Sequence, residues 1–117
     1  MIDTVIIDDD PLCINRLLDS LTAYRDVFVV GTAQTATLGK ELILKHKPCL
    51  VFLDIELPDT TGLDLLRELN ATINWPMQVV FCTAYDKYLL DALRESVFDY
   101  ILKPFDFYEL LARSRNL

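Results

Sequence analysis

Residues 50–54 read Leu50-Val51-Phe52-Leu53-Asp54, so that four apolar residues run directly into a carboxylate. The run is continuous rather than alternating, which is typical of a strand buried on both faces of a parallel sheet. Four other short runs share this character and lie at Thr4–Ile7, Val27–Val30, Val79–Cys82 and Tyr100–Leu102. Together they predict a sheet of five parallel strands.

Apolar residues at helical spacing separate these runs. They lie at residues 14–21, 38–43, 65–69 and 89–93, and again at Leu110 and Leu111. Asp10-Pro11 predicts a helix start with an N-cap and a proline at the first helical position, and Asp106 with Glu109 has capping-box spacing. Alternating strands and helices predict a doubly wound α/β fold with helices on both faces of the sheet and the leucine rows in its core.

The composition fits one soluble globular domain. The chain has 117 residues, of which 52% are hydrophobic and 25% charged, unlike a disordered chain. Its net charge of -7 argues against direct binding to DNA or an anionic membrane. Three cysteines without metal-site spacing, at positions 13, 49 and 82, are expected to be buried free thiols. Met1 leads directly into a strand-like run without a signal peptide, so we expect a cytoplasmic protein.

Polar side chains follow four of the five predicted strands. Asp8, Asp9 and Asp10 come after the first, Asp54 after the third, Thr83 after the fourth, and Lys103-Pro104 after the fifth. The carboxyl ends of parallel strands meet at one edge of the sheet, where ligands bind. Crowded carboxylates need a cation, and hard oxygen ligands suit Mg²⁺. A carboxylate can also attack phosphorus if a cation, a lysine and hydrogen-bond donors surround the transferred group.

At these positions the sequence resembles the receiver domains of two-component response regulators. The resemblance rests on Ile7–Pro11, Leu53–Pro58 leading to Gly62, Thr83-Ala84, and Asp99–Phe105. Each motif alone is weak, but the four occur in the right order and each lies at a predicted strand end. The resemblance spans essentially the whole chain. It implies that residues 1–117 form one receiver domain of flavodoxin-like fold, with strand order 2-1-3-4-5.

The resemblance also implies a phosphoacceptor and its metal ligands. Asp54 would accept the phosphoryl group. Asp9 and Asp54 would ligate Mg²⁺ directly, Asp8 would hold it largely through water, and Glu56 would offer its backbone carbonyl. The domain would therefore be a phosphoacceptor that assists its own phosphorylation and dephosphorylation, rather than an enzyme in the strict sense.

The other implied roles fall on the last third of the chain. Lys103 would pair with phosphoryl oxygens, and its bond to Pro104 would be cis. Thr83 would hydrogen-bond one phosphoryl oxygen, and its movement would let Tyr100 turn inward and reshape the surface of the fourth helix, fifth strand and fifth helix. Glu56 and Tyr85 would tune the lifetime of the aspartyl phosphate.

The resemblance further implies partners. The phosphoryl donor would be a phosphohistidine on a sensor histidine kinase, and phosphorylation would permit a homodimer. Residues 83–88 and 99–105 look like receivers attached to LytTR-type DNA-binding domains. We therefore expect DNA binding only through an output domain outside the 117 residues, a last helix cut at Leu117, and no membrane association.

Three alternatives stand beside this interpretation. Asp8–Asp10 alone could be a solvated loop and a helix cap. Asp8-x-Asp10 superficially matches the signature of Mg²⁺-dependent phosphohydrolases with an aspartyl nucleophile, although the chain is too short for a cap domain. A receiver-like interaction module that has lost phosphorylation is the third. We expect His46 and Trp75 to be structural.

Overall fold

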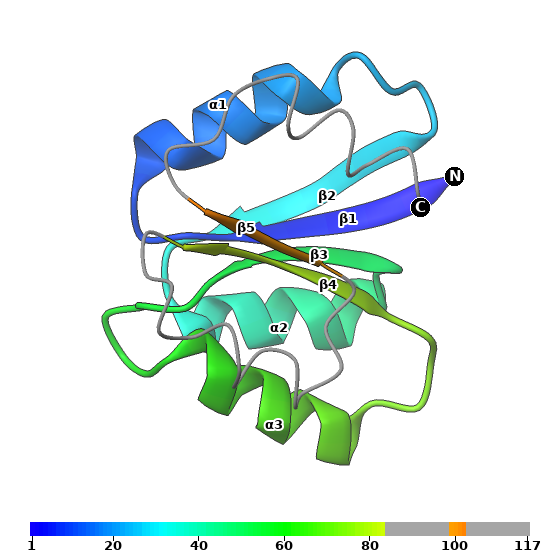
Figure 1. The fold of residues 1–117 in the computed structure, drawn as a ribbon. Helices are drawn as coiled ribbons and strands as arrows, with labels where there is room; N and C mark the ends of the chain where they lie inside the picture. The colour runs from blue at the N-terminus through cyan, green and yellow to red at the C-terminus, as the bar shows by residue number, and fades with distance from the viewer. Residues whose placement is uncertain (84–98, 103–117) are drawn as a thin grey trace.

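The computed structural model describes residues 1–83 and 99–102 (Figure 1), with side chains described as far as Cys82. Five strands and three helices lie in this part of the chain. Their order is β1 (Ile2–Ile7), α1 (Pro11–Leu21), β2 (Val27–Ala33), α2 (Ala36–His46), β3 (Leu50–Asp54), α3 (Gly62–Thr72), β4 (Gln78–Thr83) and β5 (Asp99–Leu102). The helices predicted near residues 89–93 and 110–111 and the capping box at Asp106 lie outside the described residues.

The strands form one parallel sheet in the order β2-β1-β3-β4-β5, which confirms the predicted topology. From β1 the chain moves outward to β2 and then returns to the other side of β1 as β3. This reversal makes the boundary between β1 and β3 the switch point, where open parallel sheets bind ligands beyond their carboxyl ends.

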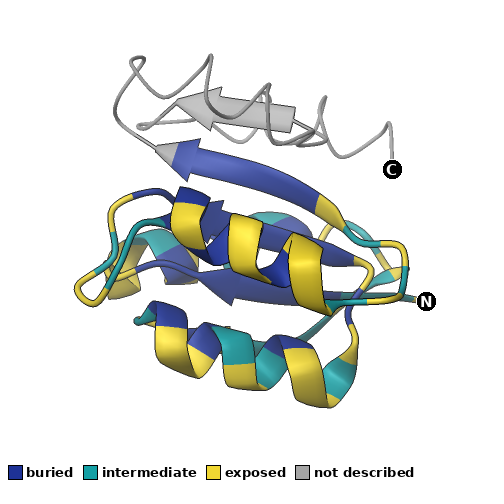
Figure 2. Ribbon diagram, turned by 90° about the horizontal axis from the view of Figure 1, so that it is seen from below, coloured by how far each residue is buried: buried dark blue, intermediate teal, exposed yellow. Residues whose placement is uncertain are grey.

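Both faces of the sheet are covered, which explains the continuous apolar runs. In Figure 1, α1 lies on one face of the sheet, and α2 and α3 lie on the other. Successive residues of β3 point to opposite faces, so Val51 and Leu53 join the core under α2 and α3, whereas Leu50 and Phe52 join the core under α1. Figure 2 shows the central strands buried and the outward helix faces exposed.

Each described helix begins at a polar side chain. Asp10 is the N-cap of α1, accepts a hydrogen bond from the Leu12 amide at 2.9 Å and precedes Pro11, as predicted. Thr35 caps α2 by accepting from the Leu38 amide at 3.2 Å, and Thr61 caps α3 by accepting from the Asp64 amide at 3.1 Å. These caps satisfy amides that have no partner within the helix.

Two predictions about burial are wrong in part. Leu38 was expected in the core but is 52% exposed. The inward face of α2 consists of Ala36, Gly39 and Ile43, and Leu38 precedes Gly39 by one residue, which turns it about 100° away. Of the three cysteines only Cys82 is buried, whereas Cys13 is half-buried and Cys49 exposed. All three are free thiols.

Trp75 closes the amino-terminal end of the sheet. Its indole N–H donates to the Pro48 carbonyl at 2.9 Å, and the Lys47 ammonium lies 5.9 Å from the ring centroid. The ring also packs against the core under α2 and α3. These contacts support a structural role for Trp75. Among the described helices, none has both the length and the apolar character required to cross a membrane.

Candidate functional site

Three carboxylates converge where β1 and β3 end. Asp8 and Asp9 follow β1 directly, and Asp54 is the last residue of β3. One carboxylate oxygen from each of the three lies within 4.8 Å of the others. Because β1 and β3 are neighbours in register, with Ile7 opposite Leu53, the backbone alone brings these residues together.

The three carboxylates differ in their exposure to solvent. Asp8 is 1% exposed and Asp54 6%, whereas Asp9 is exposed. The Asp10 amide donates to Asp8 Oδ1 at 2.9 Å, and the Asp8 amide donates to the Ala33 carbonyl at 2.9 Å, which fixes Asp8 between β1 and β2. Burying carboxylates is costly unless hydrogen bonds or a cation compensate. The site therefore favours a bound cation.

The same loop separates Asp10 from this cluster. Asp10 points to α1, where Oδ1 accepts from the Leu12 amide and Oδ2 accepts from the Cys13 thiol at 3.4 Å. The helix-cap interpretation is thus correct for Asp10, but Asp8 is no solvated loop residue. Because Asp10 is occupied at the helix start, the arrangement does not favour the Asp8-x-Asp10 phosphohydrolase.

The backbone behind Asp54 is held by a close approach of Gly62. A Cβ atom on Gly62 would lie 2.3 Å from the Asp54 carbonyl oxygen and 3.1 Å from the Ile55 Cα. Real Cβ atoms do not approach backbone so closely, so only glycine fits. The Gly62 amide also donates to the Ile55 carbonyl, at 2.6 Å. The start of α3 is therefore packed directly against the carboxyl end of β3.

Residues 55–61 form the loop that links Asp54 to α3. Ile55 is fully buried, and a single antiparallel bridge pairs Glu56 with Thr61 at the base of the loop. At its tip, Asp59 reaches the N-terminus of α2. Its Oδ1 accepts from the Ala36 amide at 2.9 Å, and its Oδ2 accepts from the Thr37 amide at 2.9 Å and the Thr37 hydroxyl at 2.7 Å.

These hydrogen bonds stabilise the ionised form of Asp59. The Thr37 hydroxyl, followed by the Ala36 and Thr37 amides, lowers the pKa of the Asp59 carboxyl from 3.8 to about 2. The positive end of the α2 dipole acts in the same direction. Asp59 is thus an anion at neutral pH.

The donor set suits Mg²⁺. Carboxylate oxygens are the hard ligands that Mg²⁺ prefers, and the ion usually binds through one or two carboxylates while keeping several waters. Oxygens within 4.8 Å of one another can share one such ion directly or through water. Asp8, Asp9 and Asp54 would hold the ion, and its charge would there offset negative charge on a bound phosphoryl group. The Glu56 backbone carbonyl, expected as a fourth ligand, follows Asp54 by two residues.

The remaining predicted site residues are described less fully. Thr83 is the last residue of β4 and pairs with Leu102 of β5, while Tyr100 pairs with Phe81. The side chains of Thr83 and Tyr100 lie outside the described part of the structure. Lys103, Ala84, Tyr85 and Pro104 lie outside the described residues altogether, so the roles expected of them stay predictions.

Comparison with known proteins identifies the family. The profile of the response regulator receiver domain matches residues 4–115. The chain belongs to this family. The sensory transduction protein LytT of Bacillus anthracis is 39% identical over 106 residues, which cover 91% of this chain and 43% of LytT. The transcriptional regulatory protein BtsR of Escherichia coli K12 is 37% identical over 119 residues, covering 99% of this chain and 49% of BtsR.

Solved receiver domains share the fold. The response regulatory domain of mrkE from Klebsiella pneumoniae superimposes with a TM-score of 0.90 at 24% identity, covering 98% of this chain and 93% of the other. In sequence, the chain spans slightly less than half the length of the relatives LytT and BtsR.

One residue of this region escaped the sequence analysis. Asp59 occurs in the stretch Pro58-Asp59-Thr60-Thr61-Gly62, which indicates only a turn. Its partners Ala36 and Thr37 lie 23 and 22 residues earlier. Nothing in the local sequence pattern links the two segments, so only the three-dimensional structure could identify the contact.

Proposed function

We propose that this receiver domain accepts a phosphoryl group on Asp54 from a phosphohistidine of a sensor histidine kinase, in a reaction that requires Mg²⁺. The observation that carries the proposal is the convergence of the Asp8, Asp9 and Asp54 carboxylates within 4.8 Å at the carboxyl ends of β1 and β3. Two of these carboxylates are buried, which makes them costly to retain without a cation.

The chemistry follows from the position of Asp54. An Asp54 carboxylate oxygen attacks phosphorus, the new P–O bond forms as the P–N bond to the histidine breaks, and the electron pair leaves with the imidazole. Water later attacks the same phosphorus, which releases inorganic phosphate and restores the carboxylate. Asp54 is held for this attack by the Gly62 contact behind its carbonyl. Lys103 and Thr83 would contact the phosphoryl oxygens.

The consequence of phosphorylation would be a change of surface. The added charge on Asp54 would draw in the Thr83 hydroxyl, and Tyr100 would turn into the space that the hydroxyl leaves. The reshaped surface, comprising the fourth helix, β5 and the fifth helix, would dimerise or control an output domain. Similarity to the sensory transduction protein LytT and the transcriptional regulatory protein BtsR supports an output that regulates transcription. We propose that this output is of the LytTR type and acts in the cytoplasm.

Intact mass spectrometry tests the acceptor. The domain is incubated with Mg²⁺ and acetyl phosphate, and wild type is compared with Asp54→Ala. Asp64→Ala, which removes an exposed carboxylate at the start of α3, is the matched control. We expect wild type and Asp64→Ala to gain one phosphoryl group, and Asp54→Ala to gain none.

The other outcomes are equally informative. If no variant gains mass, the phosphorylation-independent interaction module becomes the better hypothesis. If Asp54→Ala still gains a phosphoryl group, another residue is the acceptor. Continuous release of inorganic phosphate from a generic phosphate ester would revive the phosphohydrolase alternative.

A further inference from the structure

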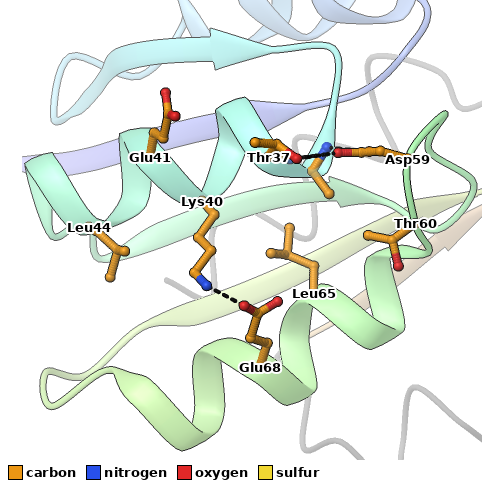
Figure 3. A pocket seen from close by; sticks show the side chains of 9 residues that line it. Thr37, Lys40, Glu41, Leu44, Asp59, Thr60, Leu65 and Glu68 are labelled. Atoms are coloured by element: carbon orange, nitrogen blue, oxygen red, sulfur yellow. Dashed lines mark hydrogen bonds and ion pairs between the residues drawn. The ribbon is translucent and has the colours of Figure 1, made fainter.

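Asp59 connects the loop after β3, which follows Asp54, to the N-terminus of helix α2. Figure 3 shows its side chain extending from the loop after β3 to Thr37, at one end of a groove of about 500 Å³ between α2 and α3. Farther along the groove, the Lys40 ammonium pairs with the Glu68 carboxylate, which joins the same two helices. At the loop tip, three hydrogen bonds join Asp59 to Ala36 and Thr37 of α2.

This contact is more than a helix cap. α2 already has its own N-cap, because Thr35 accepts from the Leu38 amide and the Gly39 amide donates to the Thr35 carbonyl. The amides left over are those of Ala36 and Thr37. Water could hydrate the Thr37 amide, since Thr37 is exposed, whereas Ala36 is buried. Asp59 supplies both acceptors from outside the helix. The energetic benefit is therefore shared between α2 and the loop that carries Asp59.

The loop that carries Glu56 is fixed at two places, its base and its tip. Its base is closed by the Gly62–Ile55 hydrogen bond and by the bridge between Glu56 and Thr61. Its tip is fixed by Asp59. These contacts at the base and the tip define the path of the loop backbone. That path determines where the Glu56 carbonyl lies relative to the Asp54 carboxylate.

We propose that Asp59 is a positioning residue for the metal and phosphoacceptor site: by binding the N-terminus of α2 it holds the loop after β3, and with it the Glu56 carbonyl, which would be a further ligand of the ion that Asp8, Asp9 and Asp54 would hold. The inference rests on the proposed function. Asp59 itself is not part of the carboxylate cluster, because both of its oxygens are bonded to the start of α2. Residues that orient metal ligands in this indirect way typically change metal affinity by tenfold or more when they are replaced.

The test compares two variants that each remove a hydrogen-bond acceptor at the N-terminus of α2. Asp59→Ala removes the contact between the loop and α2, whereas Thr35→Ala removes only the local cap of α2. Mg²⁺ affinity is measured by calorimetric titration, and phosphorylation by acetyl phosphate is followed by intact mass, at a temperature at which all variants are folded. We expect Asp59→Ala to weaken Mg²⁺ binding and slow phosphorylation by about tenfold. Thr35→Ala should leave both unchanged although it lowers the melting temperature.

A third variant changes the partner of Asp59 on α2 instead of Asp59 itself. Thr37→Ala removes the hydroxyl that donates to Asp59 but introduces the best helix-forming residue into α2. A loss of Mg²⁺ affinity in Thr37→Ala, smaller than that in Asp59→Ala, therefore cannot come from a weaker helix. Asp59→Asn, which keeps one acceptor oxygen and is closer in shape, serves if Asp59→Ala does not fold, and its expected loss is intermediate.

The outcomes separate the two proposals. If Asp59→Ala binds Mg²⁺ as wild type does, or if Thr35→Ala loses as much affinity as Asp59→Ala, the positioning role is wrong. If wild type binds Mg²⁺ but gains no phosphoryl group, the proposed function fails, while the Mg²⁺ affinities still decide the role of Asp59. If wild type binds no Mg²⁺, both are overturned.

Discussion

The two loops that bring carboxylates to the site are built differently. The loop after β1 consists of residues 8–10, and the loop after β3 consists of residues 55–61. The short loop is held by its own residues and by the adjoining strand β2, since the Asp10 amide donates to Asp8, the Asp10 side chain caps the next helix, and the Asp8 amide donates to the Ala33 carbonyl. The long loop instead depends, through Asp59, on the start of α2, where the contacting residues lie 22 and 23 positions earlier in the chain.

Because the loops differ in length, they need different numbers of contacts to hold one conformation. A short loop between two rigid elements has few conformations, so one local cap is enough to define it. A seven-residue loop has many more, and fixing it requires contacts at both its base and its tip. We therefore expect loss of the Asp10 cap in the first loop to act on α1 alone, and changes at Asp59 or Gly62 in the second to reach Asp54.

The largest effect on stability should come from the base of the long loop. Gly62→Ala forces a Cβ atom against the Asp54 carbonyl, and because the neighbour is backbone it cannot move aside cheaply. We expect a loss of about 1–3 kcal/mol in the free energy of unfolding, measured by urea denaturation. Gly31→Ala is the matched control, because its Cβ would meet only the end of the Leu42 side chain at 2.9 Å. Equal losses in both would contradict the argument.

Removing the cap of the short loop should cost less. Asp10→Ala leaves the Leu12 amide without its acceptor, and we expect the free energy of unfolding to fall by about 1 kcal/mol. Asp19→Ala, on the exposed face of the same helix near its C-terminus, should be neutral or slightly stabilising because it removes an acidic group from the negative end of the helix. A loss in Asp19→Ala as large as in Asp10→Ala would argue against capping as the cause.

Acid should act on the tip of the long loop. The pKa of Asp59 is lowered from 3.8 to about 2 by Thr37 and the first amides of α2. A carboxyl with a lowered folded-state pKa stabilises the fold above its unfolded pKa and loses that contribution as the pH falls through its folded pKa. The stability difference between wild type and Asp59→Asn should thus be constant above about pH 4 and shrink toward pH 2. Denaturation curves across that range measure it, and a pH-independent difference would refute the ionised cap.

The smallest effect should come from the ion pair between α2 and α3. Lys40 and Glu68 are 32% and 54% exposed, so water and salt screen their attraction. We expect Glu68→Gln to lower the free energy of unfolding by about 0.2–1 kcal/mol, and the loss should diminish at high salt. A larger or salt-independent loss would mean that the ion pair stabilises the packing of α2 on α3 more than is usual for a solvent-exposed pair.

The sequence predicts helix starts and strand ends from neighbouring residues: Asp10 caps the helix that begins at the next residue, and Asp54 ends a strand whose apolar run identifies it. The order of the parallel strands then brings Asp8, Asp9 and Asp54 to the same edge of the sheet. Leu38 was misassigned because several apolar stripes fit the α2 sequence, and only packing against β1 selects the one with Gly39 and Ile43. Asp59 could not be predicted, since its partners are 22 and 23 residues away. The roles of Lys103, Thr83 and Tyr100 remain predictions.

The position of Trp75 gives the domain a convenient optical probe. It is the only tryptophan in the sequence, and it lies at the opposite end of β3 from Asp54. Six residues of extended chain from Pro48 to Asp54 correspond to roughly 20 Å. Its emission should therefore report the loss of packing on unfolding but respond weakly to Mg²⁺ or phosphorylation. Fluorescence can follow stability in every variant without interference from ligands at the other end of the sheet.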